Sequence, residues 1–219
     1  MIVTIDGPAG AGKSTVARKL AQRLGFCYLD TGAMYRAVAW AGLRRNIDWN
    51  DEAAVQKLAE DTTIHWTQDR ILLDGEDVSD AIRTNEVTAA VGRAADNPAV
   101  RRWLVQLQRS AAEGVSLVTE GRDQGSIAFP DAPCKIFLVA KPEERARRRV
   151  EDFLARGEQI DFDTVLADIN SRDHADQSRP VGALVKPAGA YCVDTDGLTV
   201  EQVVDQLEKI VQGCENGCG

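Results

Sequence analysis

Apolar and polar positions form two kinds of pattern along this chain of 219 residues. The first kind is a short run of consecutive apolar residues, which is typical of strands buried on both faces. Such strands occur in parallel sheets covered by helices, so the runs predict an α/β fold with a parallel sheet. The runs are IVTID at 2–6, FCYLD at 26–30, VSLVTEG at 115–121, CKIFLVA at 134–140 and AYCVDT at 190–195.

The second kind is an amphipathic pattern that fills the segments between these runs. In the segment 14–25, Val16, Leu20 and Leu24 recur every four residues and Gly25 follows them. This spacing predicts a helix with one apolar face and a glycine stop. Further helices are expected at 32–45, at 84–95, from Pro98 to 111, in two arginine-rich stretches within 142–178, and at 200–211.

The segment 62–80 interrupts this alternation of strands and helices. TIHWT at 63–67 and RILLDGEDVS at 70–79 have the composition of short strands, and Asp74-Gly75 is a typical turn pair. We therefore expect a small β-rich insertion in the α/β fold.

The loop after the first strand has a specific glycine pattern. GPAGAGKST at 7–15 fits G-x-x-x-x-G-K-[ST] and lies between a predicted strand and a predicted helix. The backbone N–H groups of such a loop point at phosphates, which side chains would keep away. Lys13 is expected to reach the outer phosphates, and Ser14 to bind Mg²⁺. The residues expected to hold a nucleoside triphosphate are Gly7, Pro8, Ala9, Gly10, Ala11, Gly12, Lys13, Ser14 and Thr15.

Composition narrows the classes of partner and location. The net charge of -8 argues against a general nucleic-acid binder and against a polybasic membrane binder. No apolar run approaches the roughly 18 residues that span a bilayer. Asp6 interrupts the first apolar run, and no basic leader precedes it. We therefore expect a cytoplasmic protein without nucleic-acid or membrane partners.

The five cysteines form no C-x-x-C pair. Cys27, Cys134 and Cys192 lie in apolar runs, and we expect them to be small buried hydrophobic residues with reduced thiols. Cys214 and Cys218 lie in the tail 213–219, which we expect to be frayed.

The glycine loop alone does not select one class of nucleotide-binding protein. A GTPase would also need N-K-x-D after a late strand, and CKIFLVAKPEE contains no such motif. A motor ATPase would need a longer chain. A kinase needs a second pocket for an acceptor, and separate arginines can build one by binding phosphate oxygens bidentately. The candidate arginines are Arg36, Arg101, Arg122, Arg172 and Arg179.

The chain resembles the bacterial cytidylate kinases, a family of nucleoside monophosphate kinases. The glycine loop is shared by many families, whereas the combination of the other motifs is much more specific. Together the motifs cover most of the chain, from residue 3 to about 180. They are IDGPAGAGKST, LDTGAMYR, DGEDVSDAIRTNEV, NPAVRRWLVQLQR, EGRDQGSIAFPDAPCKIFL and the pair Arg172-Asp173 with Ser178-Arg179.

The resemblance implies a single P-loop kinase domain in three parts. The core would be a three-layer parallel sheet formed by 1–35, 98–142 and 180–212. An enlarged monophosphate-binding region would occupy about 36–97, including the β-rich insertion, and a short helical lid about 143–179. The implied reaction is ATP-dependent phosphorylation of CMP and dCMP with Mg²⁺. We expect the protein to be a monomer.

The resemblance also implies roles for particular residues. Thr31, Arg101 and Asp123 would face the cytosine, since a carboxylate suits its exocyclic amine and an arginine can donate to its ring acceptors. Ser14 and Glu120 would bind the metal ion. Arg36, Arg122, Arg172 and Arg179 would hold phosphates, Asp176 and Arg172 would lie near the ribose, and Tyr35 completes the expected substrate set.

The expected catalysis needs no general base, because the attacking oxygen belongs to an ionised phosphate. Alignment and positive charge would then lower the barrier. The charge would come from Lys13, the metal ion and arginines. In the lid, Arg145 and Arg148 are three residues apart and are expected on one inward face. Arg147 and Arg149 are expected to pair with Glu143 or Glu151 at the surface. The expected catalytic set is Lys13, Arg122, Arg172, Arg179, Arg145 and Arg148.

One position departs from the family pattern. Family members usually carry serine about nine residues before the arginine of the P-x-V-R motif, and its hydroxyl helps to bind the sugar. This chain has Gly92 there, which puts in doubt the separation of ribo from deoxyribo substrates. Two other interpretations stay open: a kinase for another monophosphate or for an alcohol such as shikimate, and a non-catalytic ATP-sensing module.

Overall fold

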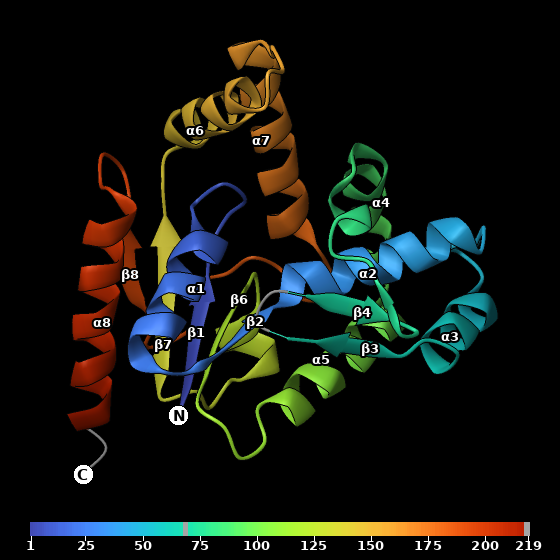
Figure 1. The fold of residues 1–219 in the computed structure, drawn as a ribbon, viewed down its shortest axis with the longest axis horizontal. Coiled ribbons are helices and arrows are strands. Elements are labelled where there is room, and N and C mark those ends of the chain that lie inside the picture. Colours follow the sequence, from blue (N-terminus) through green and yellow to red (C-terminus); the bar gives the residue numbers. More distant parts are fainter. Residues whose placement is uncertain (68–69, 217–219) are drawn as a thin grey trace. The chain divides into compact units, whose positions relative to one another are not determined.

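The computed structural model describes residues 1–67 and 70–216, and these fall into two compact units. The first unit comprises Met1–Tyr28 and Val115–Gly219, and the second comprises Leu29–Gly114 (Figure 1). These boundaries place 29–35 and 98–114 in the second unit, although the resemblance would assign both to the core. The division into core, monophosphate-binding region and lid is a division by function and stays a prediction.

The first unit is built on a parallel sheet, as the runs of apolar residues predict. Strand β1 pairs in parallel with β6 and β7, and β7 pairs in parallel with β8. The sheet order is β2-β6-β1-β7-β8, so β1 lies at the centre. The strands are β1 (Ile2–Asp6), β2 (Cys27–Asp30), β6 (Leu117–Gly121), β7 (Cys134–Val139) and β8 (Tyr191–Asp194).

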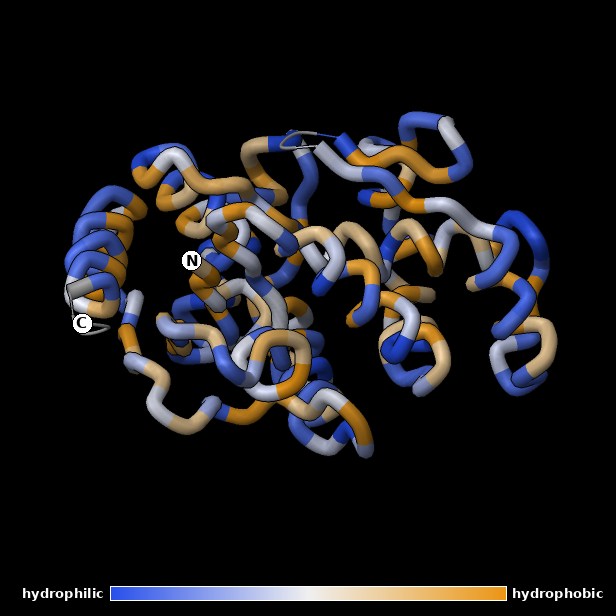
Figure 2. Tube along the Cα trace, turned by 90° about the horizontal axis from the view of Figure 1, so that it is seen from below, coloured by the Kyte–Doolittle hydropathy of each residue, from blue (hydrophilic) through white to orange (hydrophobic). Residues whose placement is uncertain are grey.

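Two helices close the core of this unit. Helix α1 (Lys13–Leu24) and helix α8 (Val200–Asn216) lie against each other and share one apolar cluster with β1 and β7. Figure 2 shows apolar residues recurring along one side of α8. On their outer faces the two helices are joined by ion pairs of Lys19 and Arg23 with Glu201, Asp205 and Glu208.

Helix α8 continues beyond its predicted end at Val211. It runs to Asn216, because Ile210 and Cys214 extend its apolar stripe onto the core cluster. Residues 213–216 are therefore helical where a frayed tail is predicted, and Cys218 lies outside the described residues. Among the described residues, no helix is both long and apolar enough to cross a membrane.

The expectation of three buried cysteines is wrong for two of them. Cys134 is fully buried, but Cys27 and Cys192 are exposed. Cys27 lies on β2 and Cys192 lies on β8, and these are the two edge strands of the sheet. An apolar run does not tell a central strand from an edge strand, and edge strands are covered less completely. The four cysteines in the described part of the chain are free thiols.

The two arginine-rich helices are present and pack on each other. They are α6 (Pro142–Ala155) and α7 (Phe162–Ser178), with Ala146, Val165 and Ile169 buried in their own small apolar cluster. The Asp161 carboxylate accepts a hydrogen bond from Thr164 N and so caps α7. Between β6 and β7 lies the short π-helix η2 (Gln124–Ala128), which the sequence pattern does not predict.

The second unit contains the predicted β-rich insertion. Three short strands form an antiparallel sheet, and Asp74 and Gly75 supply its turn with φ angles of 51° and 85°. Helix α3 was missed by the sequence pattern, although Asp51 is a good cap for it. The elements are α2 (Thr31–Arg44), α3 (Glu52–Glu60), β3 (Ile64–Trp66), β4 (Ile71–Leu73), β5 (Glu76–Asp77), η1 (Ala81–Arg83), α4 (Asn85–Asp96) and α5 (Pro98–Ala111).

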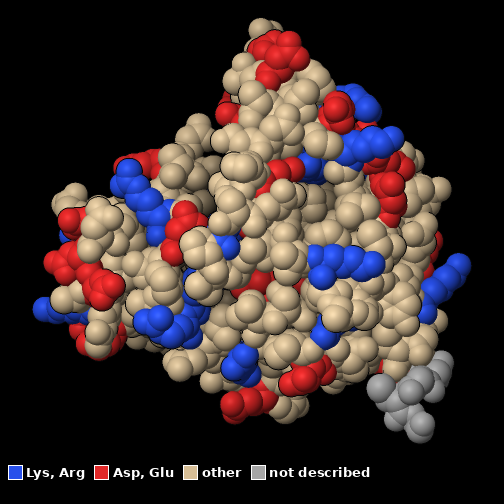
Figure 3. All heavy atoms as spheres, turned by 180° about the vertical axis from the view of Figure 1, so that it is seen from behind, with Lys and Arg blue, Asp and Glu red and all other residues tan. Residues whose placement is uncertain are grey.

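Charged side chains of both signs share the surface. On the face drawn in Figure 3, Lys and Arg side chains lie interspersed with Asp and Glu. Exposed charged side chains also form ion pairs, such as Arg45 with Asp74 at 2.9 Å in the second unit.

Candidate phosphoryl-transfer site

The phosphate loop, Gly7–Thr15, connects the central strand β1 to α1. Gly10 and Gly12 have φ angles of 79° and 84°, which side-chain-bearing residues rarely adopt. A Cβ atom at Gly7 would lie 2.4 Å from the carbonyl oxygen of Leu138 on β7. Gly12 caps α1 without any side-chain hydrogen bond, so no capping side chain occupies the first N–H groups of the helix. These groups are suited to bind an anion.

Lys13 lies inside the phosphate loop rather than in solvent. It is 5% exposed, and its Nζ atom donates to the carbonyl oxygen of Pro8 at 2.8 Å. Burial, reinforced by the charge of Arg122, lowers the pKa of Lys13 to about 7, against the opposing effects of Glu120 and Asp6. A bound polyphosphate would favour the charged amine. The lysine is therefore placed where its charge depends on an anionic ligand.

Ser14 and Glu120 meet at the start of α1. The Ser14 hydroxyl donates to Glu120 Oε1 at 2.6 Å, and Glu120 lies on β6 and is 4% exposed. A hydroxyl and a carboxylate are hard oxygen ligands of the kind that Mg²⁺ takes from proteins, the rest coming from phosphates and water. No group of three or more His, Cys, Asp or Glu ligands exists among the described residues. The oxygen atoms of Ser14 and Glu120 are of the type that suits Mg²⁺ held jointly with a nucleotide.

Three arginines gather around one buried carboxylate, and we call them the arginine cluster: Arg122, Arg172 and Arg179 with Asp176. Arg122 Nε lies 2.7 Å from Asp176 Oδ2, and Arg179 Nη2 lies 2.9 Å from Asp176 Oδ1. Burial alone would raise the pKa of Asp176, but the charges of Arg122, Arg179 and Arg172 hold it below its usual value. The charges of Arg122 and Arg172 also contribute, after burial, to lowering the pKa of Lys13. The first unit thus brings these predicted residues together beside the phosphate loop.

Arg145 joins the phosphate loop to α7. Its side chain is 3% exposed, and its Nη1 donates to the carbonyl oxygen of Ala9 at 2.9 Å. The same guanidinium binds both carboxylate oxygens of Asp173 at 3.0 and 2.5 Å, and its Nε donates to Ala140 at 3.0 Å. In this conformation Arg145 is therefore bound to protein groups on three sides.

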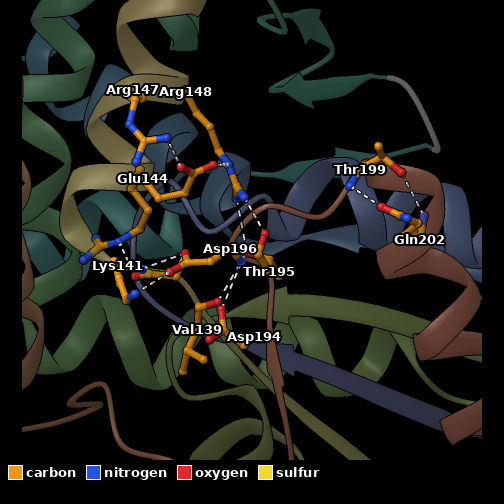
Figure 4. Close-up of polar contacts among 12 residues, drawn as sticks. Val139, Lys141, Glu144, Arg147, Arg148, Asp194, Thr195, Asp196, Thr199 and Gln202 are labelled. Atoms are coloured by element: carbon orange, nitrogen blue, oxygen red, sulfur yellow. Dashed lines mark hydrogen bonds and ion pairs between the residues drawn. The ribbon is translucent and has the colours of Figure 1, made fainter.

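Arg148 does not share the surroundings of Arg145. Its guanidinium binds Glu144 at 3.1 Å, Thr195 Oγ1 at 3.1 Å and the Thr195 carbonyl oxygen at 2.5 Å. Figure 4 shows this contact between α6 and the segment after β8, together with Arg147 on the same Glu144. Arg147 thus pairs with Glu144, whereas the expected partners were Glu143 and Glu151.

The second unit holds Thr31, Tyr35, Arg36 and Arg101, whereas the predicted substrate residue Asp123 lies in the first unit, after β6, and is 4% exposed. On α2, Arg36 donates to Thr88 Oγ1 at 2.8 Å and to the carbonyl oxygen of Ile82 at 3.3 Å. On α5, Arg101 is 4% exposed, donates to the carbonyl oxygen of Ala95 at 2.9 Å and lies over the Tyr35 ring at 5.5 Å. Thr31 begins α2 and is 3% exposed. Arg101 and Tyr35 are thus brought together within the unit.

The chain is similar to known proteins over nearly its whole length. The family model described as cytidylate kinase matches residues 3–213. The chain belongs to the cytidylate kinase family. Cytidylate kinase of Rhodopirellula baltica is 47% identical over 214 residues, covering 98% of this chain and 93% of that protein. Cytidylate kinase of Mycobacterium leprae is 49% identical over 213 residues, covering 97% and 96%.

Membership of the cytidylate kinase family makes this chain an enzyme, a phosphotransferase of the P-loop kinase class. It also confirms the family resemblance of the sequence motifs. The crystal structure of an uncharacterized protein from Eubacterium ventriosum matches with a TM-score of 0.54 at 16% identity, covering 97% of this chain and 98% of that one. At that identity the match shows a likeness of fold alone.

Two acidic residues of the site lie within the quoted sequence motifs but were given no role there. Asp6, the last residue of β1, is fully buried directly before the phosphate loop. Asp173 holds Arg145 from α7. A carboxylate at the end of an otherwise apolar strand was a signal for Asp6, since a buried charge needs partners. The role of Asp173 has no local signal in the sequence, because its partner lies 28 positions away.

Proposed function

We propose that this enzyme transfers the γ-phosphoryl group of ATP to CMP and to dCMP, in a direct in-line step. The observation that carries the proposal is the concentration of positive charge beside the phosphate loop. Burial lowers the pKa of Lys13, and repulsion by the nearby charges of Arg122 and Arg172 lowers it further, against the opposing effects of Glu120 and Asp6. Phosphate groups on both a donor and an acceptor would relieve that repulsion.

The chain's own residues would act by alignment and charge. The phosphate loop would hold the donor through its N–H groups, with Lys13 on the outer phosphates. The arginine cluster would orient the acceptor phosphate, whose oxygen is already ionised, so that no base has to remove a proton. Ser14 and Glu120 would hold Mg²⁺, which supplies further neutralisation of phosphate charge when bound. Arg145 and Arg148 would act in the lid at 143–179, which would exclude water when closed.

The base and sugar would be read by buried side chains. We propose that Asp123 accepts from the exocyclic amine of cytosine, while Arg101 donates to the ring acceptors and Thr31 adds a hydroxyl. Support comes from burial, because Asp123 and Arg101 are each 4% exposed, and buried charged groups are concentrated at functional sites. The proposed phosphate and ribose contacts are Arg36, Tyr35, Arg122, Arg172, Asp176 and Arg179.

A panel of acceptors tests the proposal in one experiment. ADP release from ATP and Mg²⁺ is measured with CMP, dCMP, UMP, AMP and shikimate at equal concentration. CMP and dCMP are expected to give the highest kcat/KM. A higher value for AMP or for shikimate would replace the proposed acceptor with another one. Binding of ATP without turnover of any acceptor would favour an ATP-sensing module. The cytoplasmic location and the monomeric state stay predictions.

A further inference from the structure

The carboxylate of Asp6 is a buried charge to which the proposed chemistry assigns no step. Asp6 lies at the carboxyl end of the central strand, level with Gly121 on β6 and Phe137 on β7. It is completely inaccessible to solvent, and burial raises its pKa to about 6 despite two backbone hydrogen bonds. A buried carboxylate lowers the stability of the fold unless partners compensate it. Its hydrogen-bond partners therefore show what it holds in place.

Both oxygens of Asp6 hold the backbone that follows Asp123. Oδ1 accepts from Gln124 N at 2.8 Å, and Oδ2 accepts from Gly125 N at 2.7 Å. These N–H groups open the π-helix η2, and the first N–H groups of a helix have no partner within it. A carboxylate from β1 therefore supplies the cap that a residue of the loop itself would normally supply.

The same turn is fixed from two further sides. Thr119 on β6 donates to Gln124 Oε1 at 2.9 Å, and the Asp123 carbonyl oxygen accepts from Ile127 N at 2.8 Å. The turn is also tightly packed at Gly125, where a Cβ atom would lie 2.8 Å from Thr4 Oγ1 and 3.3 Å from Asp6 Oδ2. The backbone on the carboxyl side of Asp123 is thus held by two neighbouring strands, and Asp6 provides both of the charged contacts.

We propose that Asp6 is a positioning residue that fixes the direction of the Asp123 carboxylate and so sets the preference for the acceptor base. This inference rests on the proposed function, in which Asp123 reads the cytosine amine. Asp6 itself touches neither substrate in the proposal. Its effect should therefore fall on recognition of the acceptor and leave the donor largely unaffected, although Lys13 is also within electrostatic reach.

Asp6→Asn tests the inference, because the amide keeps the shape but offers one acceptor oxygen to two N–H donors. The KM for CMP is expected to rise about tenfold, and the ratio of kcat/KM for CMP over UMP to fall about tenfold. The KM for ATP should stay within about twofold. Asp51→Asn is the matched control, since Asp51 also accepts two N–H groups, at 3.0 and 3.1 Å, at the start of α3. It should leave all three values unchanged.

Equal changes in the KM values for CMP and ATP, or an unchanged ratio of CMP to UMP, would overturn the positioning role. Should Asp6→Asn not fold, Asp6→Ser replaces it, because a hydroxyl can accept one bond and leaves room for water at the other. Amide hydrogen exchange gives a readout independent of activity, and Gln124 and Gly125 should lose protection in either variant. A wild-type enzyme that does not phosphorylate CMP would overturn the proposed function and this inference together. An active wild type with unaltered selectivity in the variant would overturn the inference alone.

Discussion

The phosphate loop and the acceptor residues of α2 and α5 would bind their proposed ligands in different ways. The loop is nine consecutive residues whose backbone would supply the contacts, with Gly10 and Gly12 in conformations that side chains disfavour. The acceptor residues are side chains set by other elements, as Arg36 is held by Ile82 and Thr88 and Arg101 by Ala95 and Tyr35. A backbone site accepts any polyphosphate, whereas a side-chain site can be specific. Changes in the loop should therefore abolish chemistry, and changes among the acceptor residues should alter selectivity.

The largest expected effect is on the loop side of this comparison. Lys13→Ala should lower kcat by about a thousandfold with every acceptor, because it removes a charge aimed at the transferred phosphoryl group. ADP release at saturating substrates measures it, with the thermal midpoint as a check on folding. Lys19→Ala, an exposed residue of the same helix that pairs with Glu201, is the control and should keep wild-type turnover. Near wild-type turnover in Lys13→Ala would contradict the assignment of the loop.

Selectivity should respond next, at Asp123. Asp123→Asn replaces an acceptor of the cytosine amine with a group that can donate to the uracil carbonyl. The ratio of kcat/KM for CMP over UMP is expected to fall by a factor of about 10 to 100, as for loss of a charged hydrogen bond. The KM for ATP should stay unchanged. Asp131→Asn, at an exposed position eight residues further on, should keep the wild-type ratio. An unaltered ratio in Asp123→Asn would remove this residue from the base site.

The pH dependence of ATP binding should report on the loop side of this comparison. The pKa of Lys13 is lowered to about 7 in the free enzyme by burial and by Arg122. Above pH 7 the free lysine is increasingly neutral, and binding of ATP must return its proton. The affinity for ATP should therefore fall as pH rises, by up to about tenfold for each pH unit above 7.

Isothermal titration of ATP between pH 6 and 9 measures this dependence. Lys13→Met is the control, because it cannot titrate and should show only the shallow dependence due to ATP itself. Parallel curves for wild type and variant would show that Lys13 remains charged in the free enzyme over this range.

The smallest expected effect concerns the sugar. A Cβ atom at Gly92 on α4 would meet nothing within 4 Å, so a serine side chain has room there. Gly92→Ser should lower the KM for CMP by a factor of about 2 to 5, as one neutral hydrogen bond allows. Gly92→Ala is the matched control, since it shares the gain in helix propensity and lacks the hydroxyl. Equal KM values for CMP in the two variants would show that position 92 does not reach the sugar.

Prediction from sequence succeeded where a local pattern carries the information. Apolar runs predicted the parallel sheet, and G-P-A-G-A-G-K-S predicted the loop between β1 and α1. It failed where the answer depends on a distant neighbour. Cys27 and Cys192 look as buried as Cys134 in sequence, yet their strands lie at the edges of the sheet. Arg145 and Arg148 look equivalent at three residues apart, yet one binds Ala9 and Asp173 and the other Thr195.

By itself the sequence determined the family, the α/β class and the residue types available for phosphate binding, because these depend on short motifs and periodicity. Only the tertiary structure decided which charges share a partner. It placed Arg122 and Arg179 on Asp176, and Asp6 on the backbone after Asp123. The physical reason is that a buried charge is stable only beside compensating groups, and in this fold those groups come from strands and helices far apart along the chain.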